Sequence, residues 1–210
     1  MIKRISIYFI LLCILSTSYG QVQSINGTIK MLIGTTSNCS NARNFITGFG
    51  NIYEHYKQFL DIEFIPWGRT TVSETGELSC QFGPADCWAN RVQRCVISML
   101  NGDQDRIMKY MRCEFGSTLP SFSGSYQCVS EVGLRLVEVD YCVTTTGDAL
   151  EPPAHAASIE PVRIINFIPF IIFNGVIDQQ ISTQGRLRLE SVLCFALAND
   201  PTTGITQCRI

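Results

Sequence analysis

The sequence predicts an α/β fold with a helical insertion that disulfides brace. Two short apolar strands flank an amphipathic helix near the start of the chain, a cysteine-rich middle reads as mostly helical, and strands followed by a helix end the chain. Strand, helix and strand in succession are typical of two parallel strands joined by a crossover helix. The order of the elements therefore favours an α/β domain over an all-helical or all-β one.

Residues 1–20 have the pattern of a secretory signal peptide. Lys3 and Arg4 precede the apolar run 5–15, and small residues follow at the positions that a signal peptidase reads. No later segment offers the roughly 18 uninterrupted apolar residues that a membrane-spanning helix needs. We therefore expect a chain that enters the secretory pathway and carries no integral membrane segment.

The remaining residues, 21–210, have the length of one domain and no long low-complexity linker divides them. Without Lys3 and Arg4, the 16 basic residues fall to 14 against 18 acidic ones, a formal charge of about −4. No run of basic residues is present in this part of the sequence. Nucleic acid is therefore not an expected partner.

The cysteine count is odd after the signal peptide is removed. Of ten cysteines, Cys13 leaves with the signal, so nine remain, and eight of them can form four disulfides in an oxidising compartment. Zinc is the alternative, but no two cysteines have CxxC spacing, and His55 and His155 are not near a cysteine pair. Disulfides are favoured, and no metal site is predicted.

The first part of the domain is predicted to be strand, helix and strand. Residues 28–36 form a buried apolar run, and apolar residues recur at helical spacing from residue 41 to residue 56. In 60–65, Leu60, Ile62 and Phe64 lie on one side of the predicted strand and Asp61, Glu63 and Ile65 on the other, and Pro66 ends it. This order predicts a parallel pair of strands.

The middle of the chain, from residue 80 to about residue 150, is predicted to be mostly helical. One helix ends at Asn101-Gly102 and the next begins on an acidic cap and ends at Gly116, whereas 126–147 is ambiguous because β-branched residues compete with a helical period. Cys87 and Cys95 are eight residues apart, about 12 Å along one helix, which is too far for a disulfide.

After Pro161, residues 162–165 and 168–180 are predicted to be strands, with Asn174-Gly175 as a two-residue hairpin turn. A final helix follows, with its expected apolar positions at Leu187, Leu189, Val192, Leu193 and Leu197. The complete order is βαβ, a helical insertion at about 80–155, and ββα. This is the order of a thioredoxin-like fold with an insertion.

The stretch "CQFGPADCWANRVQRC", residues 80–95, resembles the signature of the gamma-interferon-inducible lysosomal thiol reductase (GILT) family, usually written CQHGxxECxxNxxxxC. The matching positions are the three cysteines Cys80, Cys87 and Cys95 together with Gln81, Gly83 and Asn90. Phe82 stands where the family has His, and Asp86 stands where it has Glu. The resemblance extends over nearly the whole chain after the signal peptide.

Two further segments resemble the active site of this family. In "TTSNCSNARNF", Cys39 takes the place of the nucleophilic cysteine and Ala42 the place of the resolving cysteine. In "IPFIIFNG", Pro169 takes the place of the cis-proline. The alternatives are a structural disulfide at Cys39 and a trans proline at Pro169. Under the resemblance, the eight structural cysteines are Cys80, Cys87, Cys95, Cys113, Cys128, Cys142, Cys194 and Cys208.

The resemblance implies thiol–disulfide chemistry that needs no cofactor, with a disulfide-containing protein as substrate. Without a sulfur at residue 42, Cys39 can form a mixed disulfide, but its release needs an external thiol such as glutathione or free cysteine. Two hypotheses follow: a binding protein with impaired or absent reductase activity, which we favour, and an active monothiol reductase. The sequence makes no prediction of oligomeric state or of the partner's identity.

Two glycosylation sequons are present, at Asn26 and Asn38. A glycan on Asn38 would restrict the access of protein substrates to the neighbouring Cys39. Both sites are predictions that agree with passage through the secretory pathway, and the expected destination is extracellular or lysosomal.

Overall fold

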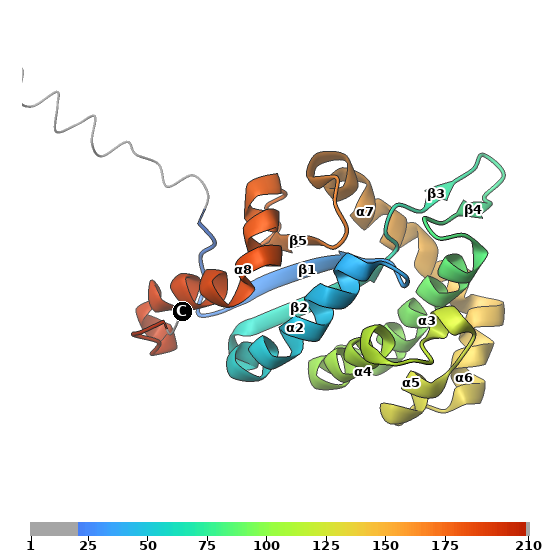
Figure 1. The fold of residues 1–210 in the computed structure, drawn as a ribbon, viewed down its shortest axis with the longest axis horizontal. Coiled ribbons are helices and arrows are strands. Elements are labelled where there is room, and N and C mark those ends of the chain that lie inside the picture. Colours follow the sequence, from blue (N-terminus) through green and yellow to red (C-terminus); the bar gives the residue numbers. More distant parts are fainter. Residues whose placement is uncertain (1–20, 209–210) are drawn as a thin grey trace, which may run out of the picture.

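The computed structural model describes residues 21–208, so the predicted signal peptide at 1–20 lies outside the described residues. Its central sheet has three strands in the order β2-β1-β5 (Figure 1). The strands are β1 (Ile29–Thr35), β2 (Leu60–Pro66) and β5 (Phe170–Phe173). β1 pairs in parallel with β2 and antiparallel with β5. The parallel pair and its crossover helix are those expected from the sequence.

Helix α2 (Ser40–Tyr56) connects β1 to β2 and packs on one face of the sheet, as Figure 1 shows. Its predicted apolar stripe is largely buried: Phe45, Ile46, Phe49 and Tyr53 belong to the main core. The long helix α8 (Gln179–Ala198) also contributes to this core and contacts β5. This core therefore fixes the start of α2 against the end of β1.

The opposite side of the sheet has a smaller apolar cluster. Ile65 of β2 and Trp67 pack there with Ala154 of helix α7 (Glu151–Ile165). Arg94 reinforces the cluster, because its guanidinium lies 5.1 Å from the centre of the Trp67 ring and donates to the Pro66 carbonyl at 2.7 Å. Helices therefore cover both faces of the sheet.

The helical insertion forms a group of helices beside α2 (Figure 1). Its elements are α3 (Pro84–Leu100), α4 (Gln104–Gly116), α5 (Gln127–Glu131), α6 (Leu136–Tyr141), a π-helix at Cys142–Thr146 and a 3-10 helix at Gly147–Leu150, after which the chain enters α7 on the other face of the sheet. The segment 126–147, ambiguous by sequence, is thus helical. A short hairpin of β3 (Thr71–Val72) and β4 (Leu78–Ser79) precedes the insertion and projects from the body of the molecule.

Four disulfides are present among the described residues, and Cys39 is unpaired. They are Cys80–Cys87, Cys95–Cys142, Cys113–Cys128 and Cys194–Cys208. The first lies at the entrance to the insertion, the next two lie inside it, and the last ties the C-terminal segment to α8. Cys87 and Cys95, as the helical spacing required, bond to other partners. No helix in residues 21–208 is long and apolar enough to cross a membrane.

The predicted strand at 162–165 is wrong. These residues form the last turn of α7, which has prolines in its first turn and ends at Ile165, with Asn166 as its C-cap residue at φ 51°. Proline is tolerated in a first helical turn because the missing N–H has no helical partner there. The β-branched residues of 162–165 favoured a strand by propensity alone, and packing against the sheet and α8 outweighed it.

The predicted hairpin after β5 is only partly correct. Asn174 and Gly175 form the turn, with φ values of 51° and 77°, but the second strand is reduced to a single bridge between Phe173 and Val176. The chain then enters α8, whose N-cap Asp178 accepts a hydrogen bond from the Ile181 N–H at 2.8 Å. A cap so soon after the turn leaves no length for another strand.

Helix α8 also corrects one predicted core residue. Leu187 is 69% exposed, whereas Leu189, Leu193 and Leu197 are buried. Arg188 has non-helical angles (φ −145°, ψ 45°), so the helix is kinked there. The kink rotates the residues before Arg188 relative to those after it. The prediction assumes one regular helix through 187–197, so it places Leu187 on the buried face.

Candidate active site

Cys39 lies where β1 passes into α2. It is the N-cap residue of α2 in an extended conformation, and the Arg43 N–H donates to its carbonyl at 2.9 Å. The side chain is only 6% exposed, and its sulfur lies 3.6 Å from the carbonyl oxygen of Ile168. Helix N-termini favour negatively charged groups, so this is a suitable position for a nucleophilic thiolate.

Ala42 lies three residues further along α2, on its buried face. Its side chain is fully buried, and it has no sulfur that could form a disulfide with Cys39. Among residues 21–208, all other cysteines are bonded in disulfides. The described chain therefore presents a single thiol at this site.

The loop between α7 and β5 faces Cys39. The Ile168–Pro169 peptide bond in this loop is cis, the isomer expected from the sequence, and the Ile168 carbonyl points to the cysteine sulfur. β5 then pairs antiparallel with β1, whose end leads into Cys39. The sheet thus brings together two segments that lie 129 residues apart in the sequence.

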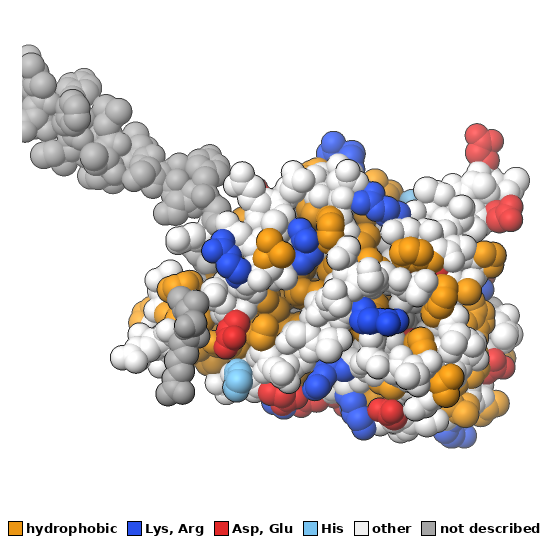
Figure 2. All heavy atoms as spheres, viewed as in Figure 1, with side chains coloured by type: hydrophobic (Ala, Val, Ile, Leu, Met, Phe, Trp, Pro, Cys, Tyr) orange, Lys and Arg blue, Asp and Glu red, His pale blue; other side chains and the backbone are white. Residues whose placement is uncertain are grey.

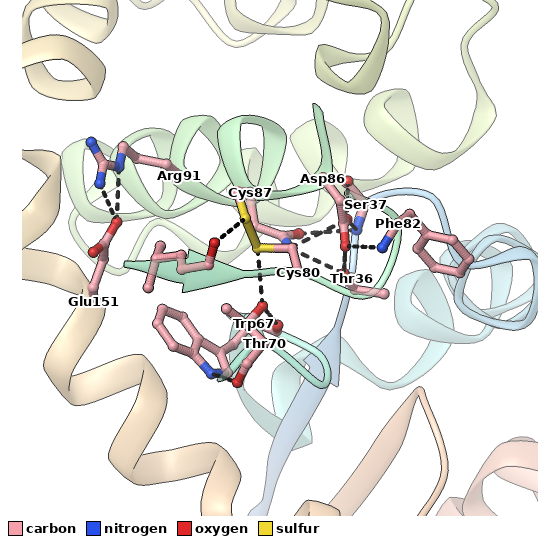
Figure 3. Close-up of a disulfide and its surroundings, with 12 residues drawn as sticks. Thr36, Ser37, Trp67, Thr70, Cys80, Phe82, Asp86, Cys87, Arg91 and Glu151 are labelled. Carbon is pink, nitrogen blue, oxygen red and sulfur yellow. Dashed lines mark hydrogen bonds and ion pairs between the residues drawn. A yellow bond between two sulfur atoms is a disulfide. The ribbon is translucent and has the colours of Figure 1, made fainter. Parts of the chain in front are cut away.

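A buried carboxylate holds the segment just before Cys39. Asp86, in the first turn of α3, is 0% exposed and accepts hydrogen bonds from both oxygen donors of that segment. The Thr36 hydroxyl donates at 2.8 Å, the Ser37 hydroxyl at 2.6 Å and the Ser37 N–H at 3.1 Å. Figure 3 shows the Asp86 carboxylate directed at both residues. A buried carboxylate with this many donors is well compensated for its loss of water.

Asn90 completes the same network one turn later in α3. Its side-chain oxygen accepts from the Ser37 N–H at 3.0 Å, and its amide nitrogen donates to the Thr36 hydroxyl at 3.0 Å. The spacing of the residue 80–95 motif singles out Asp86 and Asn90, but it does not predict what they contact. The two residues are four apart, which places their polar groups on one face of a helix. This spacing is the only indication in the sequence that they act together. Both are positioning residues for the loop that carries Cys39.

Gly83 sets the entry of the chain into α3. It is the N-cap residue with φ 82° and ψ −167°, a conformation that L side chains rarely adopt. The preceding Phe82 N–H donates to the Asp86 carboxylate at 3.3 Å, while the Phe82 ring is 38% exposed and turned away from the network (Figure 3). The Cys80–Cys87 disulfide closes this turn.

The aromatic residues His155, Trp67 and Trp88 pack within the fold, away from Cys39. His155 stacks on Trp67 with ring centres 5.5 Å apart, and Trp88 packs on Tyr126 at 5.4 Å. Neither contact belongs to the Cys39 site. Within residues 21–208 there is no group of three or more His, Cys, Asp or Glu side chains that could hold a metal ion.

Both sequon asparagines lie on the surface. Asn38 is exposed directly before the buried Cys39, and Asn26 is exposed in a turn with φ 52°. Their exposure is what a glycosylation site requires, and their modification stays a prediction. A glycan at Asn38 would stand at the mouth of the site.

Comparison with protein families gives a match over about the first half of the described chain. The family model described as "Gamma interferon inducible lysosomal thiol reductase (GILT)" matches residues 30–132, which include Cys39 and the α3 network. GILT-like protein 1 of Drosophila melanogaster is 20% identical over 91% of this chain and 82% of its own length. The gamma-interferon-responsive lysosomal thiol protein of Arabidopsis thaliana is 24% identical over 80% of this chain and 71% of its own length.

Solved structures show the same fold. DsbA of Chlamydia trachomatis aligns with a TM-score of 0.55 and 12% identity, over 87% of this chain and 95% of its own. A thioredoxin-like oxidoreductase from Silicibacter pomeroyi aligns with a TM-score of 0.54 and 12% identity, over 81% and 87%. The fold is thioredoxin-like with a helical insertion, as the order of elements predicted.

Proposed function

The chain belongs to the gamma interferon inducible lysosomal thiol reductase (GILT) family, and from this membership we propose a binding protein that keeps Cys39 but has lost the two-thiol reductase reaction. It captures a disulfide-containing protein partner through Cys39 and holds it as a mixed disulfide. The observation that carries this proposal is the fully buried methyl group of Ala42 at the position of the second sulfur.

The capture step is a thiol–disulfide exchange. The Cys39 thiolate attacks one sulfur of the partner's disulfide, a new bond forms between the two sulfurs, and the partner's other sulfur leaves as a thiolate. No electrons are gained or lost overall, because one disulfide is exchanged for another. In a two-thiol enzyme a second thiolate would then attack the Cys39 sulfur and release the reduced partner.

That second step has no nucleophile in residues 21–208, because every cysteine except Cys39 is already in a disulfide. The mixed disulfide is therefore broken only by the partner's own freed thiolate, which reverses the capture, or by a thiol from outside, which releases the reduced partner. A fold alone does not determine activity. On this fold, slow release of the reduced partner distinguishes a binding protein from a reductase.

A second candidate function is monothiol reduction, in which glutathione or free cysteine releases the partner. It is favoured by the placement of Cys39 at the start of α2 and against the Ile168 carbonyl, which retains the position of a nucleophile. The two functions share the capture step and differ in the rate of release.

The proposed location is the secretory route, ending outside the cell or in the lysosome. Four disulfides support it, because such bonds persist in oxidising compartments. The exposed sequon asparagines Asn26 and Asn38 agree with the same route.

The test compares the natural protein with Cys39→Ser on a denatured disulfide protein, with and without glutathione, at acidic and neutral pH. We expect a covalent complex on a non-reducing gel that needs Cys39, and free partner thiols at no more than one equivalent of the protein when no external thiol is added. Repeated turnover in glutathione would contradict the binding function and establish the monothiol reductase. Absence of any complex would contradict both.

Ala42→Cys supplies the missing sulfur within the same experiment. Residue 42 is about one helical turn from Cys39, so two thiols there can close the small ring of a CxxC disulfide. Because the Ala42 methyl is fully buried, the added sulfur is expected to cost about 1–3 kcal/mol in the free energy of unfolding of the reduced form. With glutathione as the external reductant, we expect shorter-lived mixed disulfides and release of partner thiols at least tenfold faster than with the natural protein. A folded variant with a disulfide between Cys39 and the introduced thiol, and no such gain, would show that more than the sulfur has been lost.

A further inference from the structure

Three consecutive residues of the α7–β5 loop are each contacted by a different part of the fold. Cys39 meets the carbonyl of Ile168, an arginine from the loop after β2 binds Asn166, and an arginine from α8 lies on Phe167. The two arginines are Arg69 and Arg186. Both cations therefore lie on the loop that faces the single thiol.

Arg69 joins the two loops that flank Cys39. Its guanidinium donates to the Asn166 side-chain oxygen and to the Asn166 carbonyl, both at 2.7 Å. The loop that carries Arg69 also packs closely against the segment just before Cys39. A Cβ added at the neighbouring Gly68 would lie 2.6 Å from the Thr36 side chain. Arg69 is exposed, and its charge faces solvent at the edge of the site.

Arg186 lies flat against the same loop from the other side. The carbon at the centre of its guanidinium is 3.7 Å from the centre of the Phe167 ring, and its one hydrogen bond within the described part of the chain is a long one of 3.5 Å to the Thr183 hydroxyl. Its Nε is buried without a partner among these residues. The guanidinium is thus fixed in place with most of its donors unused.

These cations, together with Arg43 in the first turn of α2, have no acidic neighbour in the described chain. Within residues 21–208, no Asp or Glu oxygen lies within 4.0 Å of Arg43, Arg69 or Arg186, although seven other basic residues are paired in this way. Figure 2 shows Lys and Arg side chains bordering the hydrophobic area between α8 and the start of α2, with acidic side chains mostly toward the lower and right-hand margins. Apart from the buried Asp86 carboxylate, the charged side chains placed around Cys39 are therefore positive, in a chain of net charge −2.

We propose that Arg69 and Arg186, with Arg43, select acidic partners: the disulfide that exchanges with Cys39 is flanked by carboxylates. This inference rests on the proposed function, because it names the chemistry of the partner that Cys39 captures. Guanidinium groups bind carboxylates through paired hydrogen bonds, and the free donors of Arg186 are available for one. The Phe167 ring beside them gives the peptide an apolar surface.

The expected size of the effect follows from electrostatic attraction at short range. Charges that line a site accelerate the association of opposite charges by about tenfold or more at low ionic strength. Salt screens this attraction over about 10 Å at 0.1 M, so the preference should diminish in salt. A preference that came from shape alone would not change with salt.

The experiment measures exchange with three matched peptides, Glu-Cys-Glu, Gln-Cys-Gln and Lys-Cys-Lys, each disulfide-linked to the same nitrothiobenzoate group. Release of that coloured thiolate gives the rate of attack by Cys39, and each rate is divided by the rate with 2-mercaptoethanol to remove the peptide's own reactivity. We expect the Glu peptide to exceed the Lys peptide by about tenfold at low salt, and by about two- to threefold in 0.5 M salt.

The double variant Arg69→Gln, Arg186→Gln should lower the low-salt ratio at least threefold, whereas Arg69→Lys, which keeps the charge, should retain most of it. The matched control is Arg135→Gln at the start of α6, where the arginine is exposed and paired with Glu138. Equal normalised rates for the three peptides would overturn this inference and leave the proposed function standing. An unchanged ratio in a folded double variant would overturn it as well. Failure of even the neutral peptide to react would overturn the proposed function and this inference with it.

Discussion

Asp86 shows how one side chain can link the insertion to the candidate nucleophile. A carboxylate without solvent is costly unless donors surround it, and here the donors come from Thr36 and Ser37, 50 and 49 residues earlier. The family signature has Glu at this position, one methylene longer. In this chain the shorter Asp86 places its oxygens within 2.6–3.1 Å of the loop that carries Cys39.

Replacing Asp86 tests its positioning role. In Asp86→Asn, an amide N–H faces donors that need an acceptor, so we expect a loss of about 2–3 kcal/mol in the free energy of unfolding. We also expect at least a threefold change in the rate at which iodoacetamide alkylates Cys39, a readout that a purely structural defect far from the site would not change. Asp86→Glu, which keeps the carboxylate, should recover most of the natural alkylation rate.

The control for this prediction is Asp140→Asn. Asp140 is an exposed carboxylate that accepts from the Tyr126 hydroxyl at 2.9 Å, within the insertion. It should change stability by less than about 1 kcal/mol and leave the alkylation rate of Cys39 unchanged. A similar alkylation change in both variants would contradict a specific role for Asp86.

Single residues of the site could be predicted to different extents. Cys39, Ala42 and Pro169 could be located because each lies in a short local pattern. The bonds from Asp86 and Asn90 to the Thr36–Ser37 segment could not, because they join distant parts of the chain that only the packed fold brings together. Their function as site residues stays a prediction.

At the scale of elements, the contact between β1 and β5 depends on a missing side chain. A Cβ added at Gly34 in β1 would lie 2.0 Å from the Phe170 ring, which is itself fully buried. Gly34→Ala must therefore displace an aromatic ring in a packed core, and we expect a loss of about 2–3 kcal/mol in urea-induced unfolding. Because β5 follows directly on Ile168 and Pro169, the same change should also alter the reactivity of Cys39.

Gly48→Ala in α2 is the matched control for Gly34→Ala. Nothing in the described chain lies within 4 Å of a Cβ added there, and the position is inside a helix. Alanine is a better helix former than glycine, so we expect a gain of about 0.5–1 kcal/mol. Equal effects of the two substitutions would contradict the close packing of β1 on β5.

The elements themselves were predictable where a clear hydrophobic period coincided with clear end signals. The strand-helix-strand unit at the start meets both conditions, and so does the helix ending at Asn101-Gly102. The predicted strand at 162–165 is wrong because Asn166, the next residue, is a left-handed cap that ends a helix. The short second strand after Asn174 was wrong because the N-cap of α8 begins four residues later.

At the scale of the whole molecule, Glu114 couples stability to pH. Burial raises the pKa of this carboxyl above the usual 4.5, although hydrogen bonds from Ser121 and Gln93 oppose the shift. A raised pKa means that the folded state holds the proton more tightly than the unfolded state. The contribution of Glu114 to stability is therefore fully present below pH 4.5 and is lost as the pH rises through the raised value.

Glu114→Gln should remove this dependence, since glutamine does not titrate. We expect the variant's free energy of unfolding, relative to the natural protein, to increase as the pH rises from about 4.5 toward neutral. Chemical unfolding at several pH values measures the difference. The control Glu138→Gln, in an exposed pair with Arg135, should show little change. A difference that decreased with rising pH would contradict the raised pKa of Glu114.

The nested disulfides of the insertion determine what a proteolytic cut in this segment would produce. Cys113–Cys128 lies inside the loop closed by Cys95–Cys142. A single peptide-bond cut anywhere between residues 95 and 142 thus leaves two fragments that are still covalently joined, and a cut between 113 and 128 leaves them joined twice. Because most of α3 precedes this loop, the Asp86 side of the network would remain attached to the Cys39 segment in a nicked chain. A nick in the insertion would then be visible only after the disulfides are reduced, because the two fragments migrate as one species until then.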